Sequence, residues 1–226
     1  MIEPQGESGD HLWRVPEVGH VYRDAFRLLF ILVCGSAPLE SPHDDWDRAF
    51  YGEKRALAID FWLRYPDYLA DQLLNIYSNV GDESVLRAAE RIFEEDEPDI
   101  RLVKMIRWRR GAFDDLQTSL AVLGYRGLAR SMKRKLPTGS YRYEYLTGPK
   151  AREFLDEAVA GQPGLAWYER QTQLALQVAQ DKSGSALKDI HYAEGEYAAT
   201  PYGASIPSIK NRVLERIASI RGGIKV

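Results

Sequence analysis

Apolar residues in the N-terminal part of the chain recur at helical spacing and predict several helices. The first predicted helix is apolar on nearly all sides, as expected of a central, buried helix. Its apolar residues are Tyr22, Phe26, Leu28, Leu29, Phe30, Ile31, Leu32 and Val33. Further helices are predicted over about 49–64, from Pro66 onward and over about 82–95. The stretch GSAPLESPHDDW, which follows the first helix, is expected to be a loop.

The middle of the chain combines extended and helical patterns. Residues 100–110 form a short segment with apolar positions, which predicts extended chain or a strand. Residues 128–147 hold two strand patterns joined by PTGS, which predict a β-hairpin. Between them, Asp114 or Asp115 is expected to cap a helix that Gly124 ends, and Pro149 opens another helix. Helix, hairpin and helix in this order is the arrangement of a winged helix-turn-helix. We therefore predict a mainly α fold with a small β-hairpin, in which a winged helix-turn-helix domain carries helical extensions.

The sequence GQPG at positions 161–164 breaks the pattern and marks the best candidate boundary along the chain. We expect a helical region leading into the winged unit over 1–160, and a C-terminal extension over 161–226. The extension begins with a helix over 165–180, and residues 181–207 lack a strong period and predict an irregular connector. A terminal helix follows, and its apolar stripe either packs on its own domain, the commoner case, or docks elsewhere. The stripe consists of Ile209, Val213, Ile217 and Ile220.

Charge is distributed unevenly along this chain of 226 residues, whose net charge is −3. Residues 100–160 contain 13 Lys and Arg against 6 Asp and Glu, so the remainder is strongly acidic. A basic segment inside an acidic chain indicates a surface for an anionic partner, either phosphate or a carboxylate-rich protein. Arginines stand just before the candidate recognition helix, and the motif KRK lies on the predicted wing. The candidate binding residues for nucleic acid or an acidic partner are Arg107, Arg109, Arg110, Lys133, Arg134, Lys135 and Arg142.

The acidic start of the predicted recognition helix weakens sequence-specific base reading. The helix offers Gln117, Thr118 and Ser119, but it begins with Asp114 and Asp115, which a phosphate backbone would repel. The alternative for the basic hairpin is that its lysines and arginines only keep it solvated.

Chemical motifs for catalysis or cofactor binding are sparse. Neither GxGxxG nor GxxxxGK[ST] occurs, and an S-x-x-K match at Ser185 stands without its companion motifs. The run EEDEPD lacks calcium-loop spacing, and His43 with its two neighbouring aspartates fits an exposed helix start better than a metal site. Cys34 is expected to be a buried hydrophobe rather than a reactive thiol. We therefore expect a protein that is not an enzyme and needs no cofactor or metal.

Targeting signals are also missing from the pattern. The N-terminus shows no basic region followed by an apolar one, so a secretory signal is not expected. The longest apolar run, 28–34, is much shorter than the roughly 20 residues of a membrane-spanning helix. We expect a cytoplasmic protein without a membrane partner.

Three segments taken together resemble one known group of proteins. They are EKRALAIDFWLRYPDYLADQLL, IRWRRGAFDDLQTSLAVLGYRGLA and YRYEYLTGPKAREFLDEA. In this order they resemble the small middle component of ABC-three-component anti-phage defence systems, the group that includes the Lamassu systems. The resemblance covers roughly residues 53–160, and its second half is shared by many winged-helix proteins. The insert DESVLRAAERIFEEDEPD departs from the group's pattern. It affects how far the contacts that the group makes with its partner subunits apply to this chain.

The resemblance implies a non-catalytic adaptor subunit. Such subunits are thought to sit between an SMC-like ATPase and an effector, often a nuclease, until foreign DNA ends are sensed. Double-stranded DNA would then be contacted through the assembled complex. The leading alternative is a free-standing winged-helix transcriptional regulator that binds a short palindrome as a dimer. An enzyme with an unrecognised site is the third and weakest hypothesis.

Overall fold

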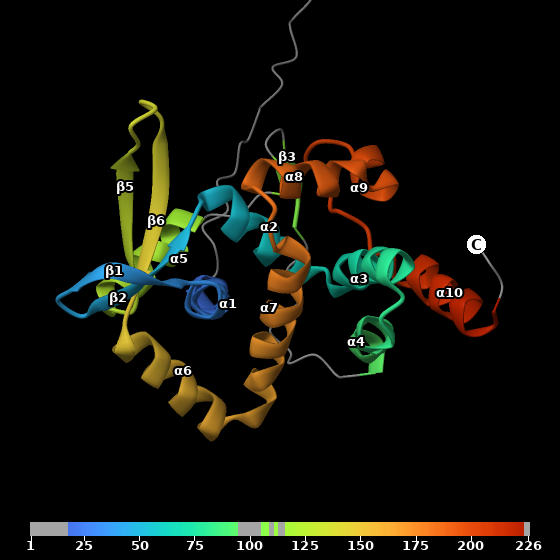
Figure 1. The fold of residues 1–226 in the computed structure, drawn as a ribbon, viewed down its shortest axis with the longest axis horizontal. Coiled ribbons are helices and arrows are strands. Elements are labelled where there is room, and N and C mark those ends of the chain that lie inside the picture. Colours follow the sequence, from blue (N-terminus) through green and yellow to red (C-terminus); the bar gives the residue numbers. More distant parts are fainter. Residues whose placement is uncertain (1–17, 95–104, 109–110, 113–115, 224–226) are drawn as a thin grey trace, which may run out of the picture.

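The computed structural model describes residues 18–94, 105–108, 111–112 and 116–223, and it is mainly helical with a small antiparallel sheet (Figure 1). The described helices are α1 (Val18–Cys34), α2 (Glu53–Arg64), α3 (Pro66–Val80), α4 (Glu83–Glu94), α5 (Leu116–Tyr125), α6 (Pro149–Gly161), α7 (Ala166–Ala179), α8 (Gly184–Ala193), α9 (Gly195–Ala199) and α10 (Lys210–Arg221). The described strands are β1 (Ala37–His43), β2 (Trp46–Tyr51), β3 (Arg107–Trp108), β4 (Gly111–Ala112), β5 (Arg130–Lys135) and β6 (Tyr141–Thr147).

Helix α1 lies in the hydrophobic core, as its apolar pattern predicts. Residues Leu28–Leu32 are all buried, and α1 is in contact with α2, α5, α6 and α7. The α1–α2 contact also contains charges. Asp60 of α2 accepts hydrogen bonds from Arg27 Nε at 2.6 Å and Arg64 Nε at 2.8 Å, and all three side chains are buried. Asp24, which is partly exposed, pairs with both arginines and completes a network of four charged side chains at the edge of the core.

The sheet has four strands in the order β1–β2–β6–β5. Two sequence predictions are wrong here, because the expected loop and the first residues of the helix predicted over 49–64 form the β1–β2 hairpin. The prolines in β1 conceal the strand, but an edge strand tolerates proline. The Asp44–Asp45 turn places Asp44 at φ 50°, a conformation that aspartate tolerates better than most residues. Phe50 is fully buried opposite Tyr145 of β6, a pairing that no local pattern reveals.

Gly148, between β6 and α6, is required by close packing. A Cβ atom at this position would lie 1.7 Å from the carbonyl oxygen of Asp45, so only glycine lets the β1–β2 turn rest on the start of α6. Arg152 of α6 and Asp47 of β2 form a bidentate pair at 3.0 and 2.7 Å across the same junction. The hairpin of β1 and β2 therefore fixes the direction in which α6 leaves the sheet.

The β-hairpin and the helices on either side of it are confirmed. Strands β5 and β6 pair in regular register, and Gly139 at φ 82° forms part of the connecting turn. Helix α6 begins at Pro149, and α5 ends at Tyr125, one residue beyond the predicted Gly124. The expected caps of α5, Asp114 and Asp115, lie outside the described residues.

The C-terminal region is more regular than predicted. Residues 184–199 form α8 and α9, so the irregular connector expected over 181–207 is wrong for this part. Ser183 caps α8 by accepting a hydrogen bond from the Ala186 backbone, and Leu187, His191 and Tyr197 are buried. His191 packs with its ring against Phe61 and Trp62 of α2. Burial against another helix thus stabilises a segment whose own sequence shows only weak periodicity.

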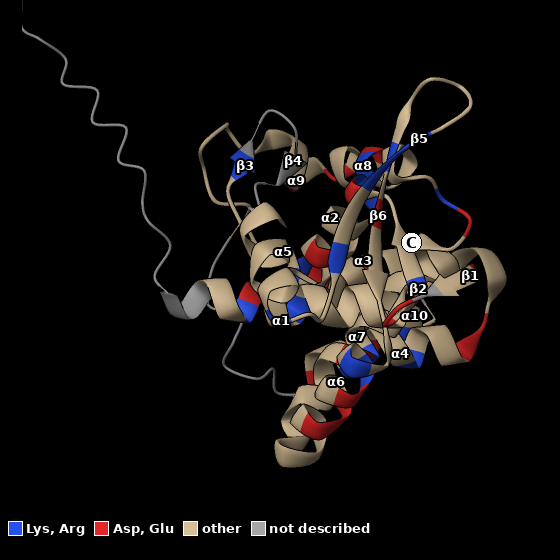
Figure 2. Ribbon diagram, turned by 90° about the vertical axis from the view of Figure 1, so that its left-hand side faces the viewer, with Lys and Arg blue, Asp and Glu red and all other residues tan. Residues whose placement is uncertain are grey.

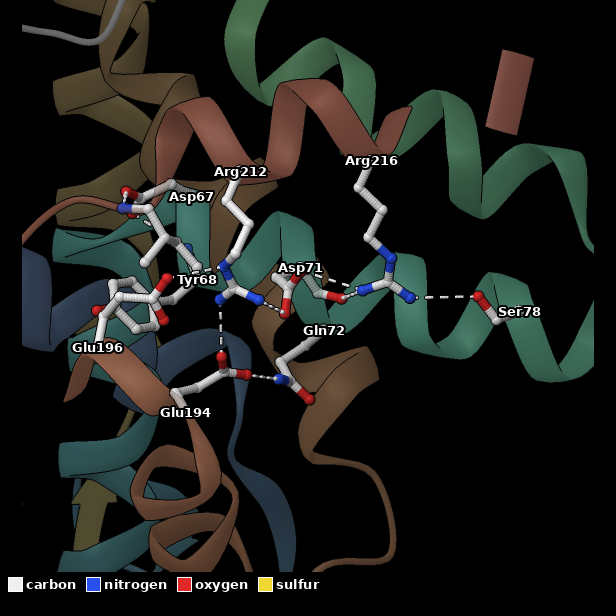
Figure 3. A network of polar contacts seen from close by, with 10 residues as sticks. Asp67, Tyr68, Asp71, Gln72, Ser78, Glu194, Glu196, Arg212 and Arg216 are labelled. Atoms are coloured by element: carbon white, nitrogen blue, oxygen red, sulfur yellow. Dashed lines mark hydrogen bonds and ion pairs between the residues drawn. The ribbon is translucent and has the colours of Figure 1, made fainter. Parts of the chain in front are cut away.

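Helix α10 packs on α3, which confirms the commoner of the two expectations for the terminal helix. Val213 and Ile217 are buried, and two arginines one turn apart extend from α10 toward α3 (Figure 3). Arg216 donates to Asp71 at 3.0 Å, and Arg212 donates to Glu194 at 2.9 Å. Burial, reinforced by the nearby charge of Asp71, raises the pKa of the Glu194 carboxyl. One hydrophobic cluster runs from α1 to α10 and crosses the predicted boundary at residue 161.

Candidate nucleic-acid interface

Strands β5 and β6, with the turn between them, form the element that we call the basic hairpin. Strand β2 pairs with residues 144–147 of β6, whereas β5 runs along β6 as far as Tyr141. The outer part of the hairpin therefore has no third strand and projects from the sheet as a two-stranded ribbon (Figure 1). A ribbon of this kind presents both of its faces to solvent or to a partner.

Strand register divides the basic hairpin into two faces. Alternate residues of a strand point to opposite sides, and directly paired residues share a side. Lys133 is paired with Tyr143, and Lys135 is paired with Tyr141, so one face carries lysines and tyrosines. Arg134 is paired with Arg142, and Met132 with Glu144, so the other face carries arginines and one acid. We call these the Lys/Tyr face and the Arg/Glu face.

On the Arg/Glu face, a buried carboxylate holds two arginines. Like charges directly opposite each other destabilise a strand pair, and Arg134 and Arg142 are such a pair. Glu144, which is 1% exposed, relieves the repulsion because its Oε1 accepts from Arg142 Nη2 at 2.7 Å and pairs with Arg134 Nε at 3.1 Å. The Arg142 guanidinium also lies 4.5 Å from the ring centroid of Tyr51. Both arginines are thus fixed in place, yet the side chain of Arg134 remains 59% exposed and that of Arg142 remains 42% exposed.

On the Lys/Tyr face, a lysine lies over two aromatic rings. The Lys133 ammonium is 4.5 Å from the ring centroid of Tyr141 and 5.7 Å from that of Tyr143. Such cation–π contacts keep the charge of the lysine available, since the ring does not neutralise it. Lys133 and Lys135 are exposed, and so is Arg130 at the base of β5. The hairpin from Arg130 to Thr147 thus contains five basic residues and one acid, and Figure 2 shows the basic positions along it.

The sequence-predicted site residues are only partly brought together. Lys133, Arg134, Lys135 and Arg142 lie on the basic hairpin, whereas Arg107 lies on β3, well away from it in both ribbon views (Figures 1 and 2). The Arg107 guanidinium donates to the backbone oxygens of Ala198 and Thr200. Arg109 and Arg110 lie outside the described residues. Among the described candidates, four therefore lie together on the hairpin and Arg107 lies apart from them.

Two rings and a carboxylate belong to the site but were not among the predicted site residues. Tyr51 and Glu144 position the arginines, and Tyr141 supports Lys133. The alternation in YRYEYLT already places the tyrosines on one face and Arg142 with Glu144 on the other. Tyr51 gives no such signal, because its contact with Arg142 depends on pairing between strands that are far apart in sequence.

Helix α5 presents a different surface from the basic hairpin. Leu116, Leu120 and Leu123 are buried, which leaves Gln117 and Tyr125 exposed. This exposed side carries a polar and an aromatic residue rather than a row of cations. Helix α5 itself therefore contributes no cation to this region.

A second candidate surface is a groove between α1, α5 and α6. Its volume is about 450 Å³, and its walls are mainly apolar. Phe26 and Phe154 meet edge to face, with ring centroids 6.2 Å apart, and part of Phe154 stays exposed. Arg126 and Lys150 contribute positive charge, and the Lys150 ammonium donates to the Arg126 backbone oxygen at 2.7 Å. The groove thus combines an apolar floor with a basic edge.

Other potential chemistry in the described part of the chain is limited. No group of three or more His, Cys, Asp or Glu residues is placed there to hold a metal ion. Burial and the charge of Glu169 raise the pKa of the Cys34 thiol to about 11, which keeps it protonated and weakly nucleophilic. None of the described helices combines the length and apolar character that a membrane span requires.

Comparison of the chain with protein-family models, with curated proteins and with solved structures gave no match. The functional argument therefore depends on the site itself.

Proposed function

We propose that the protein is a non-catalytic adaptor subunit of a bacterial anti-phage defence complex, in which it links an SMC-like ATPase to an effector nuclease. Its basic hairpin contacts the phosphate backbone of DNA in the assembled complex. The observation that carries this proposal is the projecting ribbon with Lys133, Arg134 and Lys135 exposed along one strand. Cations that are held in position and stay hydrated can release counterions from a duplex on binding.

The order of elements supports a winged-helix reading of this region. In a winged helix, the strand after the first helix lies beside the second wing strand, and the recognition helix directly precedes the first wing strand. Here α1 is followed by the hairpin of β1 and β2, of which β2 pairs with β6, and α5 directly precedes β5. Helices α2–α4 would then be an insertion between the first strand and the recognition helix. This reading makes the basic hairpin the wing and places it where such folds approach phosphates.

An adaptor needs a protein contact as well, and the groove between α1, α5 and α6 is our candidate. Its basic edge and apolar walls suit an amphipathic helix that carries acidic residues, supplied by the ATPase subunit. Phe154→Glu should abolish co-purification with a co-expressed ATPase. Leu214→Glu on α10, a residue of similar exposure, should leave co-purification unchanged.

Two results would show that something other than the ATPase subunit occupies the groove. A wild-type dimer that Phe154→Glu converts to a monomer would make the groove an interface between copies of this chain. Stronger ATPase capture after removal of residues 1–17 would assign the groove to that segment. Co-purification that survives Phe154→Glu would contradict the groove as the contact.

The DNA contact is tested by charge reversal on the full-length protein. Lys133→Glu with Lys135→Glu should abolish retention of duplex DNA at low salt. Arg134 is left in place, because reversing it would put a second acid beside buried Glu144. Lys54→Glu with Lys210→Glu is the matched control, since it changes net charge equally at two exposed helix starts, where glutamate is favourable. Unchanged DNA retention by the hairpin variant would contradict the proposal.

The transcriptional-regulator alternative is distinguished by the same assay. It is favoured only by the exposed Gln117 on α5, which is a residue type that reads adenine. A regulator would bind one short palindrome tightly as a dimer, and Gln117→Ala would relax its sequence preference. The adaptor would bind weakly, without sequence preference and with strong salt dependence.

A further inference from the structure

The tip of the basic hairpin carries an aromatic ring that the fold does not use for its core. Tyr145, at the base of β6, is completely buried, Tyr143 is half-buried, and Tyr141 is 58% exposed. All three point to the same face, because they alternate along one strand. Tyr145 therefore belongs to the core, whereas Tyr141 presents an exposed aromatic surface beyond Glu144, the last residue that pairs with β2.

Lysines flank this ring on the same face. Lys135 is the direct cross-strand partner of Tyr141, and Lys133 is its diagonal neighbour, with its ammonium 4.5 Å from the ring centroid. Two lysines at positions i and i+2 of a strand have Cα atoms about 6.8 Å apart. One exposed ring thus lies beside two lysines of the neighbouring strand, whose ammonium groups can reach successive phosphates of one nucleic-acid strand.

The alternative role of Tyr141 is purely structural, as a support for Lys133. Lys133 already has this support from Tyr143, at 5.7 Å, and that ring is more buried. A ring whose only role was to support the lysine would not need to stay more than half exposed, and its exposure carries a solvation cost for an apolar surface. The exposed ring area at the tip is what a planar ligand would cover.

We propose that Tyr141 stacks against an unpaired base of single-stranded DNA, while Lys133 and Lys135 bind the flanking phosphates. This inference rests on the proposed DNA contact and deepens it, because it names unpaired ends as the preferred form of DNA. Bases in an intact duplex have their faces covered by their neighbours, so a tyrosine can stack only where a base is free. Aromatic side chains between cations are the general means of binding single strands without sequence preference.

The test compares two DNA probes with one set of full-length variants. Fluorescence anisotropy measures the Kd for a labelled oligo-dT of about 12 nucleotides, within the site sizes of such modules, and for a blunt duplex. Tyr141→Ala should weaken oligo-dT binding by about 5- to 100-fold and change duplex binding less than about 2-fold. Tyr141→Phe should bind oligo-dT like the wild type, since the ring remains.

Tyr202→Ala is the matched control, because Tyr202 is also an exposed tyrosine with a cation over its ring, in this case Arg107. It should leave oligo-dT affinity unchanged. Thermal melting of each variant confirms that the fold is intact before binding is compared.

The outcomes separate this inference from the broader proposal. Wild-type oligo-dT affinity in Tyr141→Ala, with duplex binding that still depends on Lys133 and Lys135, overturns base stacking and leaves the phosphate contact standing. Equal losses for oligo-dT and duplex also overturn it, because the ring would then act only on the shape of the hairpin. If the wild type retains neither probe at low salt, the proposed DNA contact fails as well.

Discussion

Arg107 and Arg134 belong to two basic motifs of similar appearance, but the fold uses them in opposite ways. The Arg107 guanidinium donates to backbone oxygens in and just beyond α9 and lies within 6.0 Å of the ring centroids of three tyrosines, Tyr192, Tyr197 and Tyr202. Arg134 makes one ion pair at its Nε and otherwise remains exposed on a projecting ribbon. The difference shows that an arginine-rich motif can be used for contacts within the fold, so the motif alone does not identify a binding surface.

The core also contains charged side chains that, like Arg107, make their contacts within the protein. Arg27 and Arg64 are paired with Asp60 inside the core, where they join α1 to α2. Substitution of such interior charges should lower the free energy of unfolding without changing DNA affinity. Substitution of hairpin charges should change DNA affinity and have little effect on the free energy of unfolding. Each of the following predictions tests one side of that contrast.

The largest effect is expected for Asp60→Ala. It removes the buried carboxylate that joins Arg27 and Arg64 and leaves them the partly exposed Asp24, and breaking a buried ion pair costs about 3–5 kcal/mol. Urea denaturation should show this loss of unfolding free energy. Asp47→Ala, which removes a half-exposed ion pair with Arg152, should cost less than about 1 kcal/mol. Equal losses in the two variants would contradict the distinction between interior and surface charge.

Arg107→Ala should have the next largest effect. Two backbone oxygens lose a charged donor, which corresponds to about 1–3 kcal/mol. Chemical denaturation should record the loss, while the affinity for duplex DNA stays at the wild-type value. If Arg107→Ala has normal stability but has lost DNA binding, the prediction is wrong and Arg107 is part of the DNA-binding surface.

The buried His191 should make stability depend on pH. Burial lowers its folded-state pKa to about 3, whereas an unfolded histidine titrates near 6.5. Above pH 6.5 both states are neutral, so His191 adds no pH dependence. Below pH 6.5 only the unfolded state binds the proton, and stability falls by about 1.4 kcal/mol per pH unit down to about pH 3.

His191→Leu removes this titration and should flatten the stability profile between pH 6.5 and 4 relative to the wild type. Denaturation midpoints measured across that range give the comparison. Parallel profiles for the two proteins would show that His191 accepts a proton in the folded state.

The smallest effect is expected for Glu144→Gln on the basic hairpin. It removes the acid that separates Arg134 from Arg142, so the hairpin should lose about 1 kcal/mol of stability. Duplex affinity should rise a few-fold, since the hairpin gains one net positive charge. Weaker DNA binding in a folded variant would indicate that the position of the arginines matters more than the net charge.

The elements that the sequence predicts well are those with a strong local period. The stripe of Val213 and Ile217 identifies α10, and the alternation around Tyr143 identifies β6. Strands β1 and β2 could not be predicted, because among the described strands β1 pairs only with β2, and β2 depends on pairing with β6, about 100 residues away. Helices α8 and α9 are similar, since Leu187 and His191 are buried by contact with α2 rather than by a regular pattern of their own.

The candidate site was predictable in part for the same reason. Local alternation identifies Lys133 and Lys135 as neighbours on one face, and this prediction depends only on strand geometry. The separation of Arg107 from the hairpin depends on where β3 lies relative to α9, and a charge count cannot supply that information. Tyr51, which lies against Arg142, ends a strand whose last residues were predicted to begin a helix.

The most direct test of the account is the salt dependence of duplex binding by the full-length protein. The slope of log K against log salt concentration reports the number of phosphate contacts, at about 0.9 per contact. We predict that Lys133→Ala with Lys135→Ala lowers the slope by about 2 and that Arg107→Ala leaves it unchanged. An unchanged slope in the double variant, or an equal reduction in Arg107→Ala, would contradict the basic hairpin as the DNA contact.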